Sequence, residues 1–332
     1  MTSVTATSQL TYRLFAEDDL TRVLELWERE SGWGTLSPET WRKWYVDTPH
    51  GPCIVTVAAD EEGEILGQLV FTPARVSVDG RVVQGLRLSA PVLSPRLRGT
   101  ARSILDHPVA RLYTVGIEEA WARGYSLVYA FTQSAWLSFF RSGVRMGLPP
   151  FADAEYPCLA RPFAPAPPKA MCKGCVATRI TTFGDEFRSL WETANLSFPI
   201  HCGVVRVPGW LDYKNSSHIT LEVRDPEDGV LIGYSAMRAQ DGLLMDILAR
   251  RPAHLTTVLA ATLEWLANRS GDPALGGVDT LKAMATPQLR RALQTFGFQP
   301  VDYTFAFISN PLDPNLALEE IAPERWYLAP GD

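Results

Sequence analysis

The most informative stretch of the sequence is Val92-Leu93-Ser94-Pro95-Arg96-Leu97-Arg98-Gly99-Thr100-Ala101. It reads as an apolar strand, then a loop with arginine and glycine, then the start of an amphipathic helix. Exposed backbone N–H groups and the helix dipole make such a start suited to an anion. Glycine lets the backbone approach a phosphate closely, and arginine adds bidentate donors. The stretch therefore favours a phosphorylated ligand; an ordinary strand-to-helix turn with solvated arginines is the alternative.

Hydrophobic periodicity predicts regular elements on both sides of this loop. Before it, we expect strands at 12–15, 54–59, 66–72 and 82–93, with helices over 18–29 and around Trp41. After it, we expect a helix over 103–123, a strand at 127–131 and a helix through Phe140.

The proline-rich segment Pro162–Pro168 divides the chain near its middle, because closely spaced prolines resist both helix and sheet. After it a similar order is expected, with strands at 176–181, 219–223, 231–237 and 243–248 and helices at 186–195, 255–268 and 287–296. Trp41 and Trp210 are 169 residues apart, and Gly67 and Gly233 are 166 apart. This near-constant offset predicts a duplicated domain, at 1–161 and 175–332 with a linker at 162–174. Two unrelated α/β domains are the alternative.

The order of elements resembles the GNAT acyl-CoA N-acyltransferases over nearly the whole chain. VLSPRLRGTARSIL (92–105) is similar to that family's V-x-x-P-x-x-R-G-x-G-x-G/A segment, which cradles the coenzyme A pyrophosphate. FTQSAWLSFFRSG (131–143) and LQTFGF (293–298) resemble its strand-end turn and helix end. ETWRKWYVDTP (39–49), answered by VVRVPGWLDYKNS (204–216), resembles double-domain members in particular.

This resemblance implies an α/β (α+β) fold of two tandem GNAT-like domains, each a mixed, mostly antiparallel sheet flanked by helices. It implies an N-acyltransferase that uses acetyl-CoA or another acyl-CoA, bound in the N-terminal domain, and a small-molecule amine as acceptor. The residues expected to bind the cofactor are Val92, Leu93, Ser94, Arg96, Arg98, Gly99, Thr100, Ala101, Arg102, Ser103, Ser134 and Phe140.

The sequence also departs from the family pattern. Ala101 and Ser103 replace two glycines in the register that starts the loop at Arg98. Phe139 and Phe140 stand where a tyrosine often protonates the leaving thiolate in the family. A non-catalytic CoA-binding protein is therefore the alternative function, and a tRNA-dependent aminoacyl transferase of the related Fem type is a third.

The expected reaction is direct attack of a neutral amine on the thioester, for which a base or water chain must accept a proton. A backbone N–H near Leu93 would polarise the thioester carbonyl. Candidate bases are Glu28 and Glu30, which end the first helix, and His50, whose ordinary pKa suits the role. A solvated surface role is the alternative for each.

The second half lacks an Arg-Gly loop. Its matching segment runs from Asp246 to His254 without glycine, and Pro252 removes a backbone donor. We therefore expect a degenerate copy that supports or lines the acceptor cleft, with Asp246 as its strand acid. Binding of a second anion by Arg250, Arg251 and His254 is the alternative.

Composition limits the remaining classes. The 332 residues are 46% hydrophobic with a net charge of −6, which fits a folded protein and argues against a wide nucleic-acid surface. Neither a signal peptide nor an apolar run of membrane length is present, so we expect a cytoplasmic monomer or homodimer without nucleic-acid or membrane partners. The excess of arginine over lysine suggests a GC-rich bacterial genome. Cys172 and Cys175 have the spacing of half a zinc site, but no second pair exists, so no metal is expected.

Overall fold

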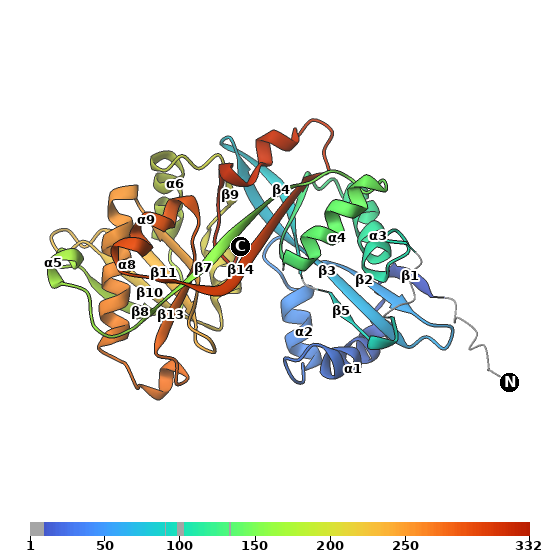
Figure 1. The fold of residues 1–332 in the computed structure, drawn as a ribbon, viewed down its shortest axis with the longest axis horizontal. Helices are drawn as coiled ribbons and strands as arrows, with labels where there is room; N and C mark the ends of the chain where they lie inside the picture. The colour runs from blue at the N-terminus through green and yellow to red at the C-terminus, as the bar shows by residue number, and fades with distance from the viewer. Residues whose placement is uncertain (1–9, 90, 98–102, 133) are drawn as a thin grey trace. The chain divides into compact units, whose positions relative to one another are not determined.

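The computed structural model describes residues 10–89, 91–97, 103–132 and 134–332. The chain forms two compact units, and each unit draws on separate parts of the sequence (Figure 1). Unit 1 comprises Met1–Arg75, Val83–Ala152 and Ile308–Leu318. Unit 2 comprises Val76–Val82, Asp153–Phe307 and Glu319–Asp332.

The strands of unit 1 are hydrogen-bonded in the order β1, β2, β3, β4, β6 and β14. The pairs β1–β2 and β2–β3 are antiparallel, whereas β4 and β6 run parallel. The bounds are β1 (Thr11–Leu14), β2 (Ile54–Ala59), β3 (Ile65–Val78), β4 (Arg81–Leu88), β5 (Val92–Leu93), β6 (Leu127–Thr132) and β14 (Gln299–Pro311). All six residues of β2 are buried, as expected for an inner strand without polar alternation.

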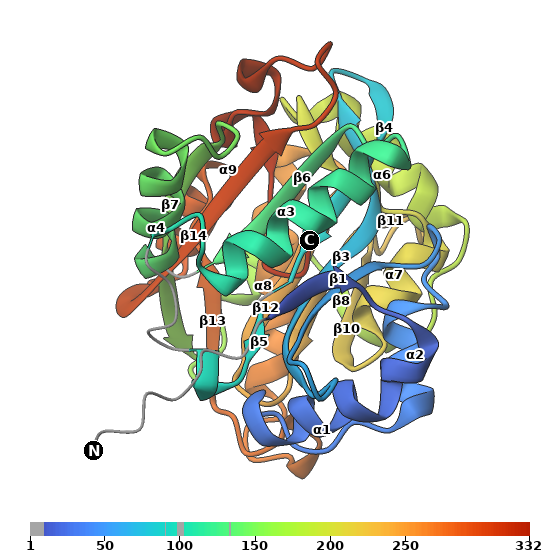
Figure 2. The same ribbon diagram turned by 90° about the vertical axis from the view of Figure 1, so that its right-hand side faces the viewer.

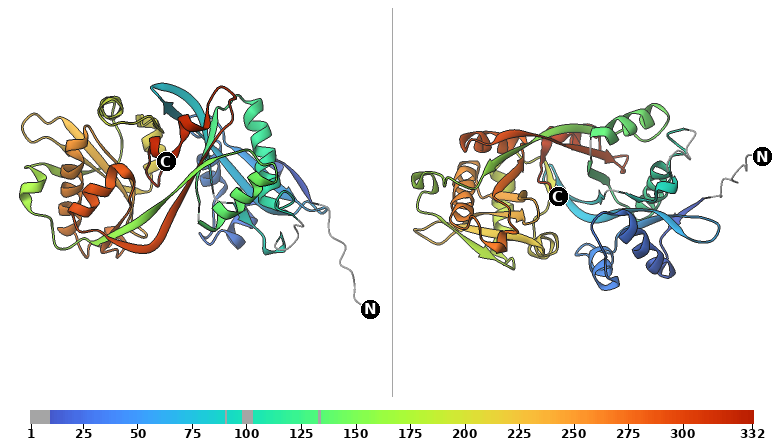
Figure 3. Two further views of the ribbon diagram at one scale, coloured as in Figure 1. Left: turned by 45° about the horizontal axis from the view of Figure 1, so that its top comes forward. Right: turned by 60° about the horizontal axis from the view of Figure 1, so that its bottom comes forward.

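Four helices flank these strands (Figure 2). Figure 3 shows the strands lying between the pair α1 and α2 and the pair α3 and α4. They are α1 (Leu20–Glu30), α2 (Pro38–Tyr45), α3 (Pro108–Ala122) and α4 (Ser134–Arg145). The α1 helix buries Val23, Leu26 and Trp27 at helical spacing in a core shared with β2 and β3. The α2 helix begins with Pro38 after Ser37, whose hydroxyl accepts the Thr40 N–H at 3.1 Å.

Two boundaries in unit 1 differ from the sequence prediction. The helix expected from Ser103 begins at Pro108, because the His107 side chain caps it by accepting the Val109 N–H at 3.2 Å. Ser103 instead belongs to a turn, in which its hydroxyl donates to Asp106 at 2.9 Å. The strand expected over 82–93 is divided into β4 and β5.

Unit 2 joins its strands in the order β14, β7, β13, β12, β11, β10 and β8. The β12–β13 pair is parallel, and the pairs β10–β8, β10–β11, β11–β12 and β13–β7 are antiparallel. The strand bounds are β7 (Ala152–Pro162), β8 (Val176–Ile180), β10 (His218–Arg224), β11 (Leu231–Arg238), β12 (Leu243–Ala249) and β13 (Thr280–Met284). Two short strands, β9 (Cys202–Val204) and β15 (Trp326–Tyr327), pair with each other, and β9 also pairs with the end of β3.

The helices of unit 2 are α5 (Lys169–Cys172), α6 (Glu186–Ser197), α7 (Pro208–Asn215), α8 (Pro252–Ala267) and α9 (Pro287–Thr295). The α8 helix packs on the sheet with ten buried residues, in line with its nearly continuous apolar sequence. The chain passes from unit 1 to unit 2 between Ala152 and Asp153, before the proline-rich segment begins. Pro162 itself is the last residue of β7 and pairs with Thr280. The strands β7, β13 and β14 had not been expected.

The element order of unit 1 recurs in unit 2. Trp41 lies in α2 and Trp210 in α7, and both are buried. Gly67 of β3 and Gly233 of β11 also correspond. A Cβ on Gly67 would lie 3.4 Å from Leu112 of α3, and a Cβ on Gly233 would lie 2.5 Å from Val258 of α8. The glycine at 233 therefore lets α8 approach the sheet closely, whereas the 3.4 Å at Gly67 is an ordinary contact.

Candidate active site

In unit 1, two parallel strands separate at the point where the phosphate loop was predicted. The register between β4 and β6 ends at Leu88↔Ala130, while β6 continues to Thr132. The chain after β4 stays with β3 instead, through the Ser89 N–H to Val70 (2.9 Å) and the β5 register Gly67↔Leu93. Neighbouring strands that part in this way leave backbone groups without a ladder partner on the inner side.

The register of this segment against β3 shifts by one residue. Ser89 N–H donates to Val70 and Ser94 N–H donates to Leu66 at 2.8 Å, so five steps on one strand face four on the other. The extra residue changes which backbone groups face β3. Because the Ser94 N–H faces β3, alternation along the ladder directs the Leu93 N–H away from β3. This donor is the one predicted for the thioester carbonyl.

A small apolar cavity lies beside the separating strands. Leu88 and Ala130, the last paired residues, line it together with Tyr113 of α3, Phe140 of α4 and Asn310 of β14. Its volume is ≈ 20 Å³, about the space of one water. The Phe140 ring is 6.1 Å from that of Tyr113 and the residue is buried, so it forms a wall of the cavity.

The predicted cofactor residues have different environments. Arg98, Gly99, Thr100, Ala101 and Arg102 lie outside the described residues. Val92 and Ser94 are buried in or next to β5, and Ser134 begins α4. The Arg96 guanidinium forms ion pairs with Glu64 and with Asp60 (3.2 Å), so its charge is already balanced within the protein. Ser103 lies in the turn before α3.

The three candidate bases lie on α1 and in the turn before β2. Glu28 and Glu30 are at the end of α1, and Glu28 accepts a hydrogen bond from Thr35 at 3.0 Å. His50 lies in the turn before β2, where burial and then the charge of Arg75 lower its pKa. Within the described residues, neither Glu28 nor Glu30 forms a hydrogen bond or an ion pair with Val92, Leu93 or Ser94. Their assignment as bases stays a prediction.

The matching turn of unit 2 has no space for a phosphate loop. Only Arg250 and Arg251 separate the end of β12 from Pro252, the first residue of α8. In unit 1, fourteen residues separate Leu93 from Pro108. The shortness of the turn, together with the missing donor of Pro252, leaves no cradle of backbone N–H groups there.

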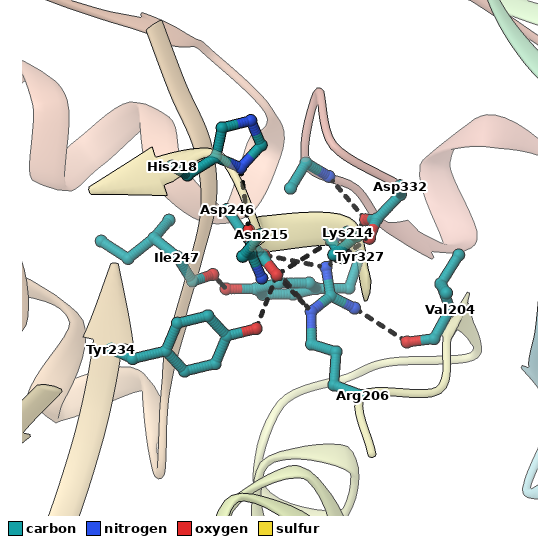
Figure 4. Close-up of polar contacts among 11 residues, drawn as sticks. Val204, Arg206, Lys214, Asn215, His218, Tyr234, Asp246, Ile247, Tyr327 and Asp332 are labelled. Atoms are coloured by element: carbon teal, nitrogen blue, oxygen red, sulfur yellow. Dashed lines mark hydrogen bonds and ion pairs between the residues drawn. The ribbon is translucent and has the colours of Figure 1, made fainter. Parts of the chain in front are cut away.

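Asp246 of β12 belongs to a buried polar cluster (Figure 4). Its carboxylate accepts hydrogen bonds from Arg206 (3.1 Å), Lys214 (3.1 Å) and Tyr234 (2.6 Å). Arg206 and Lys214 also donate to Asp332, at 2.7 and 2.9 Å. Burial alone raises the pKa of Asp246, but the charges of Arg206 and Lys214 outweigh burial and hold that pKa below its usual range.

The cluster is closed on all sides. The Arg206 guanidinium lies 5.3 Å from the ring centres of both Trp191 and Tyr327, and it donates to the Val204 carbonyl at 2.9 Å. Two cations face two carboxylates, so the charges balance. An acid with three donors and no exposed surface is a structural acceptor rather than a base for a substrate. Asp246 therefore holds Arg206, Lys214 and Tyr234 in place inside unit 2.

Two residues near the strand separation were missed by the sequence analysis. Tyr113 lines the cavity of unit 1, and burial raises the pKa of its hydroxyl, so the proton is retained. His107 caps α3 and packs its ring 4.9 Å from Phe139 of α4. The signal for His107 was readable, because a proline at the first helical position often follows the cap. Tyr113 carried no such signal.

Features of metal-binding and membrane-spanning proteins are absent from the described residues. The described residues contain no group of three or more His, Cys, Asp or Glu side chains able to hold a metal ion. Cys172 and Cys175 are buried, and burial raises the pKa of both thiols, which disfavours the thiolates that zinc requires. None of the helices in the described ranges combines the length and apolar character needed to cross a bilayer.

The chain is similar to known proteins in structure but not in sequence. No family profile and no curated protein sequence matches the chain. Among solved structures, a GCN5-related N-acetyltransferase from Anabaena variabilis is 13% identical with a TM-score of 0.61, covering 92% of this chain and 73% of that one. Another, from Sphaerobacter thermophilus, is 16% identical with a TM-score of 0.54 and coverages of 93% and 98%. Saccharomyces cerevisiae N-myristoyltransferase with bound myristoyl-CoA is 9% identical with a TM-score of 0.59 and coverages of 93% and 80%.

The chain therefore has the GNAT fold, an α/β architecture with a mostly antiparallel sheet flanked by helices. The fold class predicted from the sequence is confirmed, and the predicted resemblance to the GNAT acyltransferases is confirmed as a likeness of fold.

Proposed function

We propose that this protein is an acyl-CoA-dependent N-acyltransferase, with the acyl-CoA bound by unit 1. The observation that carries the proposal is the parting of β4 and β6 after Leu88 and Ala130, together with a Leu93 N–H that is directed away from β3. A thioester placed along Val92–Ser94 would have its carbonyl oxygen next to this donor. The shared fold with proteins whose structures contain myristoyl-CoA supports acyl-CoA as the co-substrate.

The proposed reaction balances without a further reactant. The amine nitrogen attacks the thioester carbon, and the Leu93 N–H stabilises the oxyanion that forms. The C–S bond then breaks, the amide is released, and the amine proton passes to a base or to water. Glu28, Glu30 and His50 remain the candidate bases. The coenzyme A thiolate takes a proton from water, because burial holds the proton of Tyr113, the hydroxyl that lines the cavity beside Phe140.

We propose that the loop over 98–102 contributes more than Arg96 to binding of the coenzyme A pyrophosphate. Arg98 and Gly99 carry the family's Arg-Gly pair and are proposed to bind the pyrophosphate. Arg96 is already engaged by Glu64 and Asp60. Titration calorimetry with acetyl-CoA compares the two arginines. Arg98→Ala should weaken binding about tenfold or more, because a charge-assisted hydrogen bond contributes about 1.5–3 kcal/mol. Arg96→Ala, the matched control, should change it less.

We further propose acetyl-CoA as the first donor to test, a small-molecule amine as acceptor, and unit 2 as a degenerate GNAT-like copy. Thiol release from acetyl-CoA across a panel of amines tests the activity. Turnover with any amine supports the enzyme. Absence of acetyl-CoA and CoA binding to the purified chain would refute the proposal.

A non-catalytic CoA-binding protein is the second candidate. Phe139 and Phe140 occupy the place of the usual tyrosine, and the cavity beside them has room for about one water. Binding of acetyl-CoA without thiol release, over amines and over longer acyl chains, would favour this candidate.

A further inference from the structure

Unit 2 contains a pocket on β7, β12, β13 and β14 that the proposed acyl transfer does not use. Its volume is ≈ 380 Å³, against ≈ 20 Å³ for the cavity in unit 1. Small-molecule sites typically measure about 300–1,000 Å³ and combine apolar walls with a few convergent polar groups. The pocket fits that description in both volume and chemistry.

Strand register brings its side chains to one face. Lys282 of β13 is opposite Leu243 of β12 on one side and Ala160 of β7 on the other. Side chains of directly opposed residues project from the same face of a sheet. Cys158, two residues from Ala160, lies on that face as well. These strands therefore hold Lys282 at a fixed point in the pocket wall.

The apolar wall comes from one strand. Val301, Tyr303 and Phe305 alternate along β14, so all three point to one face, and all line the pocket. The Tyr303 and Phe305 rings lie 4.8 Å apart at an interplanar angle of 85°. Tyr303 is 48% exposed and Val301 is 38% exposed, although both are large and able to pack. They form an aromatic surface that a flat molecule can cover.

The charges of the pocket sum to one positive charge. Arg238 donates to Asp241 through two hydrogen bonds, of 2.9 and 2.7 Å, so these two charges cancel. Lys282 forms no ion pair with any residue in the described part of the chain. A partly buried ammonium forms its stronger hydrogen bonds with an ionised acceptor such as a carboxylate. One net positive charge matches a monoanion better than a phosphate dianion.

We propose that this pocket binds an apolar or aromatic monocarboxylate. Its carboxylate pairs with the Lys282 ammonium, and its body lies on Val301, Tyr303 and Phe305. The site belongs to unit 2 alone and does not depend on the proposed acyl transfer. Its ligand is distinguished from an acyl-CoA by carrying one negative charge and no phosphate.

The test uses the full chain and a pair of matched probes. Indole-3-acetate carries the proposed charge and ring, whereas indole-3-acetamide has the same ring without charge. Ligand-observed NMR titration should show saturable binding of the acid, and at least tenfold weaker binding of the amide. Equal affinity of acid and amide, or no saturable binding of the acid, overturns the proposal without any variant.

Variants then locate the site. Lys282→Met keeps most of the side-chain stem and should abolish the preference for the acid, whereas Tyr303→Ala should weaken both probes. Lys169→Met, on the exposed surface of α5, is the matched control and should change neither. Acetyl-CoA binding by Lys282→Met should equal that of the wild type. A preference for the acid that survives Lys282→Met, or competition between the acid and acetyl-CoA, overturns the assignment to this pocket.

Discussion

Replacement of Asp246 by asparagine tests the balance of the buried cluster. The amide has nearly the same shape as the carboxylate but carries no charge. In the wild type, Arg206 and Lys214 face Asp246 and Asp332, and side-chain exposure is 4% for Lys214 and 0% for the other three. In Asp246→Asn the same two cations face one carboxylate, so one positive charge is left uncompensated and out of contact with water.

The magnitude follows from this loss of balance. Removing one partner of a buried ion pair destabilises a protein by about 3–5 kcal/mol. For a unit of this size, 1 kcal/mol shifts the melting temperature by about 2–4 °C, so a decrease of about 10 °C is expected. The ring contacts of Arg206 with Trp191 and Tyr327 remain in the variant and do not offset the lost charge.

Urea unfolding followed by tryptophan fluorescence measures the effect. Glu186→Gln is the matched control, because Glu186 pairs with Arg224 on the surface of the same unit and an exposed pair contributes about 0–1 kcal/mol. The pH dependence gives a second readout. Asp246 has a lowered pKa in the folded protein, so its contribution is complete above the unfolded pKa of about 4 and is lost as the pH falls toward the folded value.

The difference in unfolding free energy between the wild type and Asp246→Asn should therefore be constant near neutral pH and decrease below about pH 4. A variant that unfolds within about 1 kcal/mol of the wild type, like the Glu186→Gln control, would refute the reasoning. So would a difference that does not change with pH in the acid range.

Three further predictions concern unit 1. Gly116→Ala should destabilise the fold by about 1–3 kcal/mol in urea unfolding, because its Cβ would lie 2.1 Å from the Phe71 ring, whereas Gly209→Ala, with open space around it, should have little effect. His107→Ala should destabilise by about 1 kcal/mol through loss of the α3 cap. Burial lowers the folded pKa of His107, so its contribution to stability is complete above about pH 6.5 and is lost as the pH falls. Between pH 7 and pH 5 the unfolding free energy should therefore decrease less in His107→Ala than in the wild type. An equal decrease in both would contradict the burial of a neutral His107. Tyr113→Phe should leave kcat and acetyl-CoA binding within about twofold of the wild type, because burial holds the Tyr113 proton; a tenfold loss of kcat would instead assign Tyr113 the role of acid toward the thiolate.

Elements marked by a continuous run of apolar residues were predicted well from the sequence. The strand over 54–59 matches β2 at both ends, because six consecutive apolar and β-branched residues admit few alternatives. The helix expected from Ser103 starts five residues later, since capping by His107 and Pro108 decides its first turn. Hydrophobic periodicity does not report on caps.

The strands β7, β13 and β14 were missed because their partners are distant in sequence. Cys158 of β7 pairs with Met284 of β13, more than a hundred residues away. The buried cluster shows the same limit, because Arg206 meets Asp246 and Asp332 only after the sheet of unit 2 has formed. The roles predicted for Val92–Ser94 stay predictions. The direction of the Leu93 N–H depends on pairing with β3, which no motif encodes.

The interleaving of the units has a consequence during protein synthesis. Unit 1 needs Ile308–Leu318, and the ribosome makes this segment only after all of residues 153–307. Domains usually fold as units in the order in which they emerge, the N-terminal one first. Here the first unit to begin must wait for its last segment until most of the second has been translated. The same dependence means that a stop codon or protease cut near residue 152 separates each half from residues that it needs.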